Sequence, residues 1–155
     1  MTLISYADLA AMRLRDYVGE EADIEVEKSG MIGLVGLGGW ERLGETYFTW
    51  KQGEPFQTAG IDLDLSRAST LPRPTADQIL EELGLPVRAG ASASELLSVF
   101  GQPLDDKPGR LGVRLLRFVC GEGELFLIGC VVDDGDGLQS LFIARMDYCD
   151  EDGSI

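Results

Sequence analysis

The sequence predicts a single α+β domain over residues 1–155, in which an antiparallel sheet carries about three short helices, packed mainly on one face. Three observations lead to this fold class. The chain has 155 residues and 45% apolar residues, which suits one domain with a core of its own. Two short segments carry helix-start signals, and three apolar segments near the C-terminus are separated by short turns. Short turns join antiparallel strands, since parallel strands need long connections.

The first half of the chain predicts a helix followed by strands. Ser5 is a candidate N-cap and Gly19 is a natural stop, so we expect a helix over 6–18. Half-exposed strands alternate apolar and polar residues. The segments that alternate in this way are 22–26, 46–51 and 61–65.

Six glycines lie between Gly30 and Gly44. The segment contains neither G-x-G-x-x-G nor G-K-[ST], so the phosphate-binding motifs are missing. We interpret it as a glycine-bearing strand and a turn, with glycines that permit a bulge or close packing by another element.

Two capping boxes predict the next helices. The first, Thr75 with Gln78, begins a helix that should end at Leu83. The second, Ser92 with Glu95, begins a helix that should end before Gly101, its apolar side formed by Leu96, Leu97 and Phe100.

A three-stranded meander is expected at the C-terminus, over 112–120, 124–132 and 138–146. Turns centred on Glu122–Gly123 and on Gly135 would place Val119 opposite Phe126 and Ile128 opposite Phe142. One face would then carry Phe126, Ile128, Val132, Phe142 and Met146, and the other Leu125, Leu127, Val131, Leu141 and Ile143. Because both faces are apolar, helices can cover one, and the other needs a further layer, the N-terminal half or a partner.

Residues 87–146 resemble the repeat unit of beta-lactamase-inhibitor-like and SmpA/OmlA-type modules, which begin with a Gly-then-Ser/Thr helix start and continue into an antiparallel meander. The matching positions are Gly90, Ser92, Glu95, Leu96, Phe100, Gly101 and Pro103. The resemblance implies a non-catalytic protein-binding module and carries over no catalytic residue. It also makes 1–68 a candidate diverged copy of 75–146, followed by an acidic tail over 147–155.

Charge and composition exclude several function classes. The chain has 27 acidic and 13 basic residues and no histidine, giving a net charge of −14. Nucleic acid and anionic membranes are therefore poor partners. Without histidine there is no Ser-His-Asp triad, no Cys-His pair and no His-ligated zinc.

We expect no catalytic residue, no cofactor and no metal site. The DDGDG segment with Asp133, Asp134 and Asp136 fails the EF-hand spacing and is interpreted as a hairpin turn. The three cysteines are odd in number and lack C-x-x-C spacing, so we expect reduced thiols and a cytoplasmic protein. No signal peptide or membrane-spanning stretch is evident.

The candidate partner-binding residues are acids that should gather at one sheet edge, together with two aromatic residues: Glu122, Glu124, Asp147, Asp150, Glu151, Asp152, Trp40 and Tyr148. Such an edge would attract a basic partner, although it also suits solubility alone. The only local basic run, Lys107, Arg110, Arg114 and Arg117, should pair internally or bind an anion.

Three functional hypotheses follow. The first is a small acidic protein that binds a basic protein, most concretely an immunity protein that masks a toxin. The second is a small ligand-binding domain or enzyme that uses carboxylates or Arg in a pocket at the Gly-rich stretch. The third is a structural homodimer subunit, joined through the second apolar sheet face.

Overall fold

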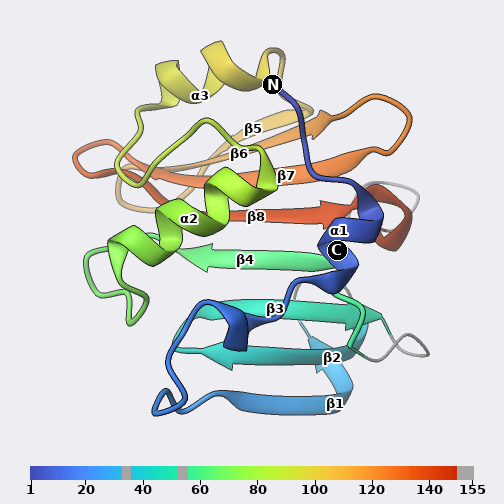
Figure 1. Cartoon of the computed structure of the whole chain (residues 1–155). Coiled ribbons are helices and arrows are strands. Elements are labelled where there is room, and N and C mark those ends of the chain that lie inside the picture. Colours follow the sequence, from blue (N-terminus) through green and yellow to red (C-terminus); the bar gives the residue numbers. More distant parts are fainter. Residues whose placement is uncertain (33–35, 52–55, 150–155) are drawn as a thin grey trace.

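A computed structural model, which describes residues 1–32, 36–51 and 56–149, confirms the α+β class. Its strands form one antiparallel sheet in the order β1-β2-β3-β4-β8-β7-β6-β5 (Figure 1). The strands are β1 Glu25–Ile32, β2 Gly36–Leu43, β3 Thr46–Lys51, β4 Gly60–Asp64, β5 Asp105–Pro108, β6 Val113–Cys120, β7 Phe126–Asp133 and β8 Gly137–Arg145. The helices are α1 Tyr6–Ala11, α2 Arg73–Leu83 and α3 Ala93–Phe100, with the 3₁₀ turns η1 Leu14–Asp16 and η2 Met146–Tyr148.

The sheet consists of two four-stranded meanders that meet in its middle. β1 to β4 follow one another in space, as do β5 to β8, and β4 pairs with β8 to join them. The expected C-terminal meander is confirmed and gains a fourth strand, β5, at the outer edge. Both halves of the chain therefore contribute to one continuous sheet.

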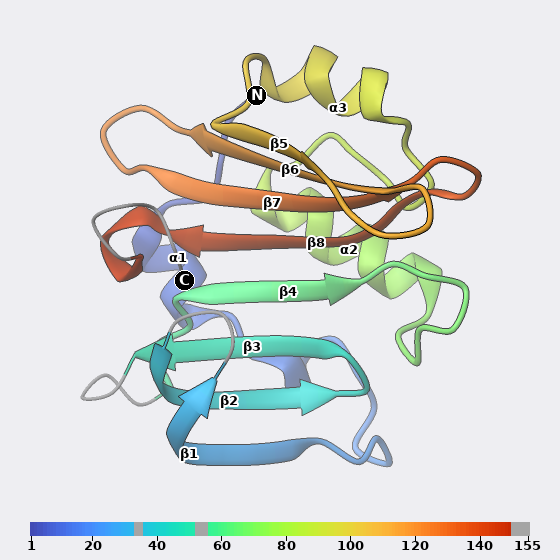
Figure 2. The ribbon, with the colours of Figure 1, turned by 180° about the vertical axis from the view of Figure 1, so that it is seen from behind.

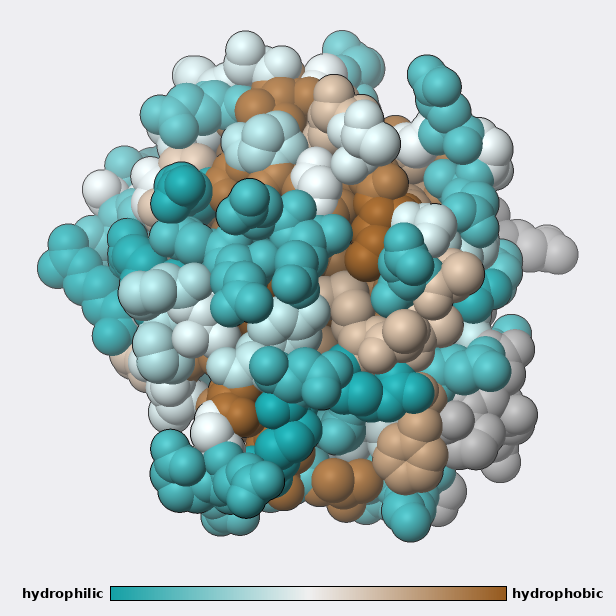
Figure 3. All heavy atoms as spheres, viewed as in Figure 1, coloured by the Kyte–Doolittle hydropathy of each residue, from teal (hydrophilic) through white to brown (hydrophobic). Residues whose placement is uncertain are grey.

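The helices lie on one face of this sheet. Figures 1 and 2 show α1, α2 and α3 on the same side, and in the view from behind the strands lie in front of these helices. The core fills the space between helices and sheet, and its fully buried members include Leu9, Ile79, Leu96, Phe118 and Ile143. Figure 3 shows the helix-bearing side mostly hydrophilic, with apolar atoms visible in patches.

The first helix is shorter than expected. α1 ends at Ala11, and the chain turns extended at Met12 before η1, so the prediction of a helix over 6–18 is wrong. Hydrogen bonds from outside explain the early end. The backbone N–H of Thr58 donates to Ala10 O, and the Thr58 hydroxyl donates to Met12 O at 2.6 Å. The Arg13 guanidinium also donates to both carbonyls, so groups from outside the helix take up its terminal acceptors.

The two later helices match the expected positions, with one different start. Ser92 caps α3 as predicted, its hydroxyl accepting from Glu95 N at 3.2 Å. α2 begins earlier than Thr75: it starts at Arg73 with Pro74 in the first turn, a position where proline costs no hydrogen bond. The prediction of Thr75 as a cap is therefore wrong.

The first hairpin of the C-terminal meander is shifted by one residue from its expected register. Cys120, rather than Val119, pairs with Phe126, so the turn centres on Gly123. Leu116, Phe118 and Cys120 consequently face the helices.

The second hairpin is also shifted along most of its length. Near the turn the pairing is as expected, but a β-bulge between Val131 and Val132 displaces the rest of the ladder by one residue. Ile128 therefore pairs with Ile143 and not with Phe142. A shift of one residue moves each side chain to the opposite face, so Phe142 lies on the side without helices. The expected division into two faces is wrong for β8.

The strands of the first half follow their patterns in part. The strand expected over 22–26 begins only at Glu25, and its ladder with β2 has an irregularity between Glu27 and Gly30. The predicted close packing at a glycine is confirmed, because a Cβ on Gly39 would lie 2.1 Å from the Trp50 ring. Trp50 itself is buried.

Candidate functional site

The predicted acidic residues gather at one end of the sheet. Phe126 pairs with Arg145, so the β6–β7 turn with Glu122 and Glu124 lies beside the end of β8 and the following Asp147. All three carboxylates are on exposed residues. Three further predicted site residues, Asp150, Glu151 and Asp152, lie outside the described residues.

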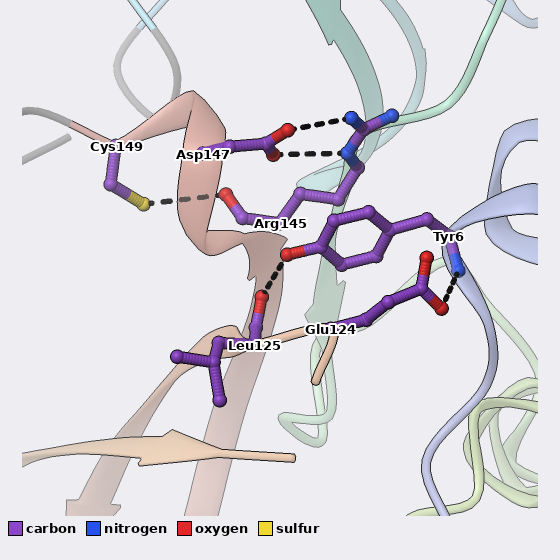
Figure 4. A network of polar contacts seen from close by, with 6 residues as sticks. All are labelled: Tyr6, Glu124, Leu125, Arg145, Asp147 and Cys149. Carbon is purple, nitrogen blue, oxygen red and sulfur yellow. Dashed lines mark hydrogen bonds and ion pairs between the residues drawn. The ribbon is translucent and has the colours of Figure 1, made fainter. Parts of the chain in front are cut away.

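Most of this end is already engaged in internal contacts (Figure 4). The Arg145 guanidinium forms two hydrogen bonds with Asp147, at 2.7 and 3.1 Å. The backbone N–H of Tyr6 donates to Glu124, and the Tyr6 hydroxyl donates to Leu125 O at 2.5 Å. Burial and the nearby Asp147 raise the pKa of Tyr6, so the hydroxyl stays a donor. Among the described residues, the carboxylate of Glu122 is the one of the three that has no hydrogen bond or ion pair.

A cleft of about 650 Å³ lies beside these acids. Residues 1–5 form one wall, and the β6–β7 turn with Glu122 and Glu124 forms another. Phe100 and Val119 contribute apolar surface, and Cys120 presents a thiol whose pKa burial raises. The raised pKa of Cys120 disfavours its thiolate, the form in which a cysteine acts as a nucleophile.

The two predicted aromatic residues are brought into one small cluster. Trp40 packs, partly exposed, against a group of buried residues that contains Tyr148. The Tyr148 ring is only 8% exposed and has Arg145 over it at 4.6 Å and Lys51 at 5.4 Å. Its ring is therefore unavailable as a protruding anchor, whereas Trp40 keeps an accessible edge.

The side of the sheet without helices carries a continuous row of paired residues that crosses all eight strands. From β1 to β5 the row is Glu25, Arg42, Tyr47, Asp62, Phe142, Gly129, Arg117 and Asp105. Residues paired directly in an antiparallel ladder point to the same face. We call this surface the open face; it also includes Trp40, Leu115 and Val119.

The two ends of the row are neutralised internally. At one end Arg42 binds Glu25 and donates to the Tyr47 hydroxyl at 3.2 Å. At the other end Arg117 binds Asp105 at 2.5 Å. Each Arg thus compensates an acid on the neighbouring strand.

The centre of the row carries an acid without such compensation. Asp62 lies between Tyr47 and Phe142, and no hydrogen bond or ion pair of the described residues involves its carboxylate. Burial, together with the nearby Asp64 and Glu45, raises the pKa of Asp62 to about 6. Sequence reasoning missed Asp62 because its alternation with Ile61 and Leu63 marks only an outward position, and the shifted register hid Phe142 as its neighbour.

Asp62 is paired with an aromatic residue on each neighbouring strand. The Phe142 ring lies over Gly129, where a Cβ would come within 2.0 Å of it. On the other side Tyr47 packs edge-to-face on Trp40 with ring centroids 5.7 Å apart, and the Arg42 guanidinium lies 5.1 Å from the Trp40 ring. Leu115 and Val119 are each 41% exposed farther along the open face.

The basic run and the DDGDG turn, two further candidates from the sequence, form contacts within the described chain. Two members of the basic run pair internally as expected, but with β5 rather than the acidic turns: Arg114 binds Asp106, and Arg117 binds Asp105. In the DDGDG turn, the Asp133 carboxylate accepts from two backbone N–H groups, as a hairpin turn requires.

The cysteines and the potential metal ligands are the next candidates from the sequence. Cys120 and Cys130 are free thiols, as expected, and both are buried. Burial raises the pKa of Cys130 to about 12, which disfavours a thiolate. Within the described ranges, no group of three potential metal ligands is found.

A search of family models, curated proteins and solved structures finds no match to this chain. The resemblance of 87–146 to inhibitor-like modules therefore stays a prediction. In the part of the chain that the structure describes, no helix has the length and apolar character to span a membrane.

Proposed function

We propose that the chain is a small acidic, non-catalytic protein-binding module of the cytoplasm, whose partner is a basic protein. Its most concrete form is an immunity-type protein that neutralises a basic toxin or effector. The single observation that carries the proposal is the open face, which combines exposed aliphatic and partly buried aromatic side chains with a central carboxylate that no described ion pair compensates.

The composition of the open face supports binding to a protein. Trp, Tyr and Arg are favoured at interface hot spots, and Trp40, Tyr47 and Arg42 contact one another here. Ion pairs at the two ends of the row surround a centre that is apolar and aromatic apart from Asp62, which resembles the polar rim and apolar core of an interface.

The charge of the whole chain supports a basic partner. Ion pairs of the described residues engage seven basic side chains but only six carboxylates, because Asp105 meets both Lys107 and Arg117. The sequence as a whole holds 27 acidic against 13 basic residues, which leaves a net charge of −14. The resulting negative field would accelerate encounter with a positively charged protein.

An affinity experiment tests this function. The full chain, immobilised through a tag, is expected to retain a basic protein from the extract of its native host, and raising NaCl from 50 to 500 mM should weaken the capture. An unrelated acidic protein of similar size and net charge serves as the control bait. Capture of the same proteins by both baits, or capture that salt leaves unchanged, would contradict the proposal.

The enzyme or ligand-binding alternative has one observation in its favour, the raised pKa of Asp62, since shifted carboxylates are common in active sites. Asp62 does not line the 650 Å³ cleft, however, and lies on a face of the sheet. We therefore rank binding of a protein above catalysis.

A further inference from the structure

We propose that Asp62 is the anchor point of the open face and receives one Arg or Lys side chain of the partner, whose hydrocarbon stem packs between Tyr47 and Phe142. This inference rests on the proposed function and adds the chemistry of recognition: the partner presents a basic side chain surrounded by apolar residues. Its basis is the placement of one uncompensated carboxylate in the middle of an eight-strand row.

The pattern of charges along the row is the first argument. Reading across the sheet, the acids Glu25 and Asp105 at its ends each meet an Arg of the same chain. Asp62, at the centre, meets aromatic neighbours instead. A partially desolvated charge without a partner costs free energy, and a cation supplied from outside would remove that cost.

The surroundings of Asp62 select the kind of cation. Tyr47 and Phe142 offer aromatic surface on either side, and Gly60 and Ala144 pair beside them with little side-chain bulk. Long basic side chains bury their methylene stems against apolar surface while the charged head reaches a carboxylate. A small inorganic cation would leave the aromatic surface unused.

Charge also distinguishes this occupant from a second copy of the chain. Two copies would bring together surfaces that each belong to a molecule of net charge −14. The arginines that the row offers, Arg42 and Arg117, are already bound to acids of the same row. A homodimer through the open face would therefore set Asp62 against another acidic surface, which is unfavourable.

The test uses three short peptides of defined sequence, acetylated and amidated: Val-Leu-Arg-Leu-Val, the same peptide with Lys in the centre, and the same peptide with neutral citrulline. Each is titrated into the full-length ¹⁵N-labelled protein, and binding is followed by amide chemical shifts. We expect the Arg and Lys peptides to shift the amides of β3, β4 and β8 around Asp62, and citrulline to weaken binding at least tenfold.

Two variants make the result specific to Asp62. Asp62→Asn should weaken binding of the Arg peptide at least tenfold, while Glu81→Gln, which removes the same charge from an exposed position of α2, should change it less than twofold. Because Asp62→Asn removes a desolvated charge, it is expected to fold at least as well as the wild type. Equal binding to both variants, shifts confined to the β6–β7 turn, or no shift at millimolar peptide would overturn the anchor.

The same variants separate this inference from the proposed function. If the wild type captures a basic protein in a salt-sensitive manner and Asp62→Asn captures it equally well, the binding function stands and the anchor is wrong. If neither bait captures a basic protein while the Arg peptide binds at Asp62, the recognition chemistry stands and the proposed biological partner is wrong.

Discussion

At the scale of single residues, the open face is shaped by a contact between a glycine and an aromatic ring. Gly129 and Phe142 are paired across β7 and β8, and the ring occupies the space where a side chain of residue 129 would lie. The Phe142 ring thus lies over Gly129 of β7, next to the position where Phe142 pairs with Asp62 of β4. The identity of residue 129 therefore determines how the centre of the open face is arranged.

Substituting Gly129→Ala is expected to destabilise the fold by about 1–3 kcal/mol, because the new methyl group would overlap the Phe142 ring. Urea unfolding followed by circular dichroism measures the loss. In the background of Phe142→Ala the same substitution should cost much less, since the obstructing ring is gone. An equal cost in both backgrounds would show that the contact does not determine the effect.

The raised pKa of Asp62 predicts a pH-dependent stability. Its folded value of about 6 lies above its ordinary value of 3.8, with burial as the main cause and Asp64 and Glu45 adding repulsion. Between these pH values the folded state binds more protons than the unfolded state, so the free energy of unfolding falls as pH rises from about 4 to 6. Above about pH 6 the Asp62 carboxylate is charged in the folded state as well, so a further rise in pH no longer lowers the free energy of unfolding through this residue.

Asp62→Asn should therefore raise the free energy of unfolding by about 1–2 kcal/mol at pH 7.5 and have little effect near pH 4. Urea titrations at both pH values check this, with Glu122→Gln as the exposed control. A variant less stable than the wild type at pH 7.5 would contradict the prediction. The result bears on function, because a carboxylate that lowers stability is more readily explained by binding than by folding.

At the scale of elements, the sequence predicted whether a segment forms a helix or a strand better than it predicted where that element begins and ends. The capping box at Ser92 identified α3 because a cap is a local interaction, and the alternation at 61–65 identified β4 for the same reason. The length of the first helix depended on Thr58, 46 residues beyond Met12, and no local pattern contains that contact. The open face escaped prediction for a similar reason: one bulge in β7–β8 moved Phe142 across the sheet.

The candidate site illustrates the same limit. The gathering of Glu122, Glu124 and Asp147 followed from strand directions, and the structure brings them to one end as expected. The sequence did not predict that Asp147 and Glu124 are engaged in internal contacts, because those contacts come from Arg145 and from the N-terminal segment around Tyr6. The neighbours of Asp62 could be predicted only if the register of four strands were known at once.

The cap of α3 allows a prediction at this scale. Ser92→Ala removes the hydroxyl that accepts from Glu95 N and should cost about 1 kcal/mol of stability. Ser98→Ala, at an exposed position inside the same helix, is the matched control and should be neutral or slightly stabilising. Thermal unfolding of the two variants would show the difference, and equal melting temperatures would mean that the cap contributes nothing.

At the scale of the whole molecule, net charge and internal pairing act in opposite directions. The described ion pairs are mostly between partly exposed side chains, and such pairs contribute little each. Repulsion among the remaining carboxylates is spread over the surface of a chain with net charge −14. Salt screens both the attraction within the ion pairs and the repulsion among the carboxylates. The sign of its effect on stability therefore shows which of these two contributions is larger.

We expect repulsion to be larger, so that the melting temperature rises when NaCl increases from 20 to 300 mM and the screening length falls below the spacing of most surface charges. The double variant Glu81→Gln/Glu122→Gln, which removes two exposed charges, should gain less from the same salt. A melting temperature that falls with salt would instead mean that the internal ion pairs dominate. The outcome also bears on recognition, since unscreened carboxylates that repel one another in the free protein are the groups that a basic partner would neutralise.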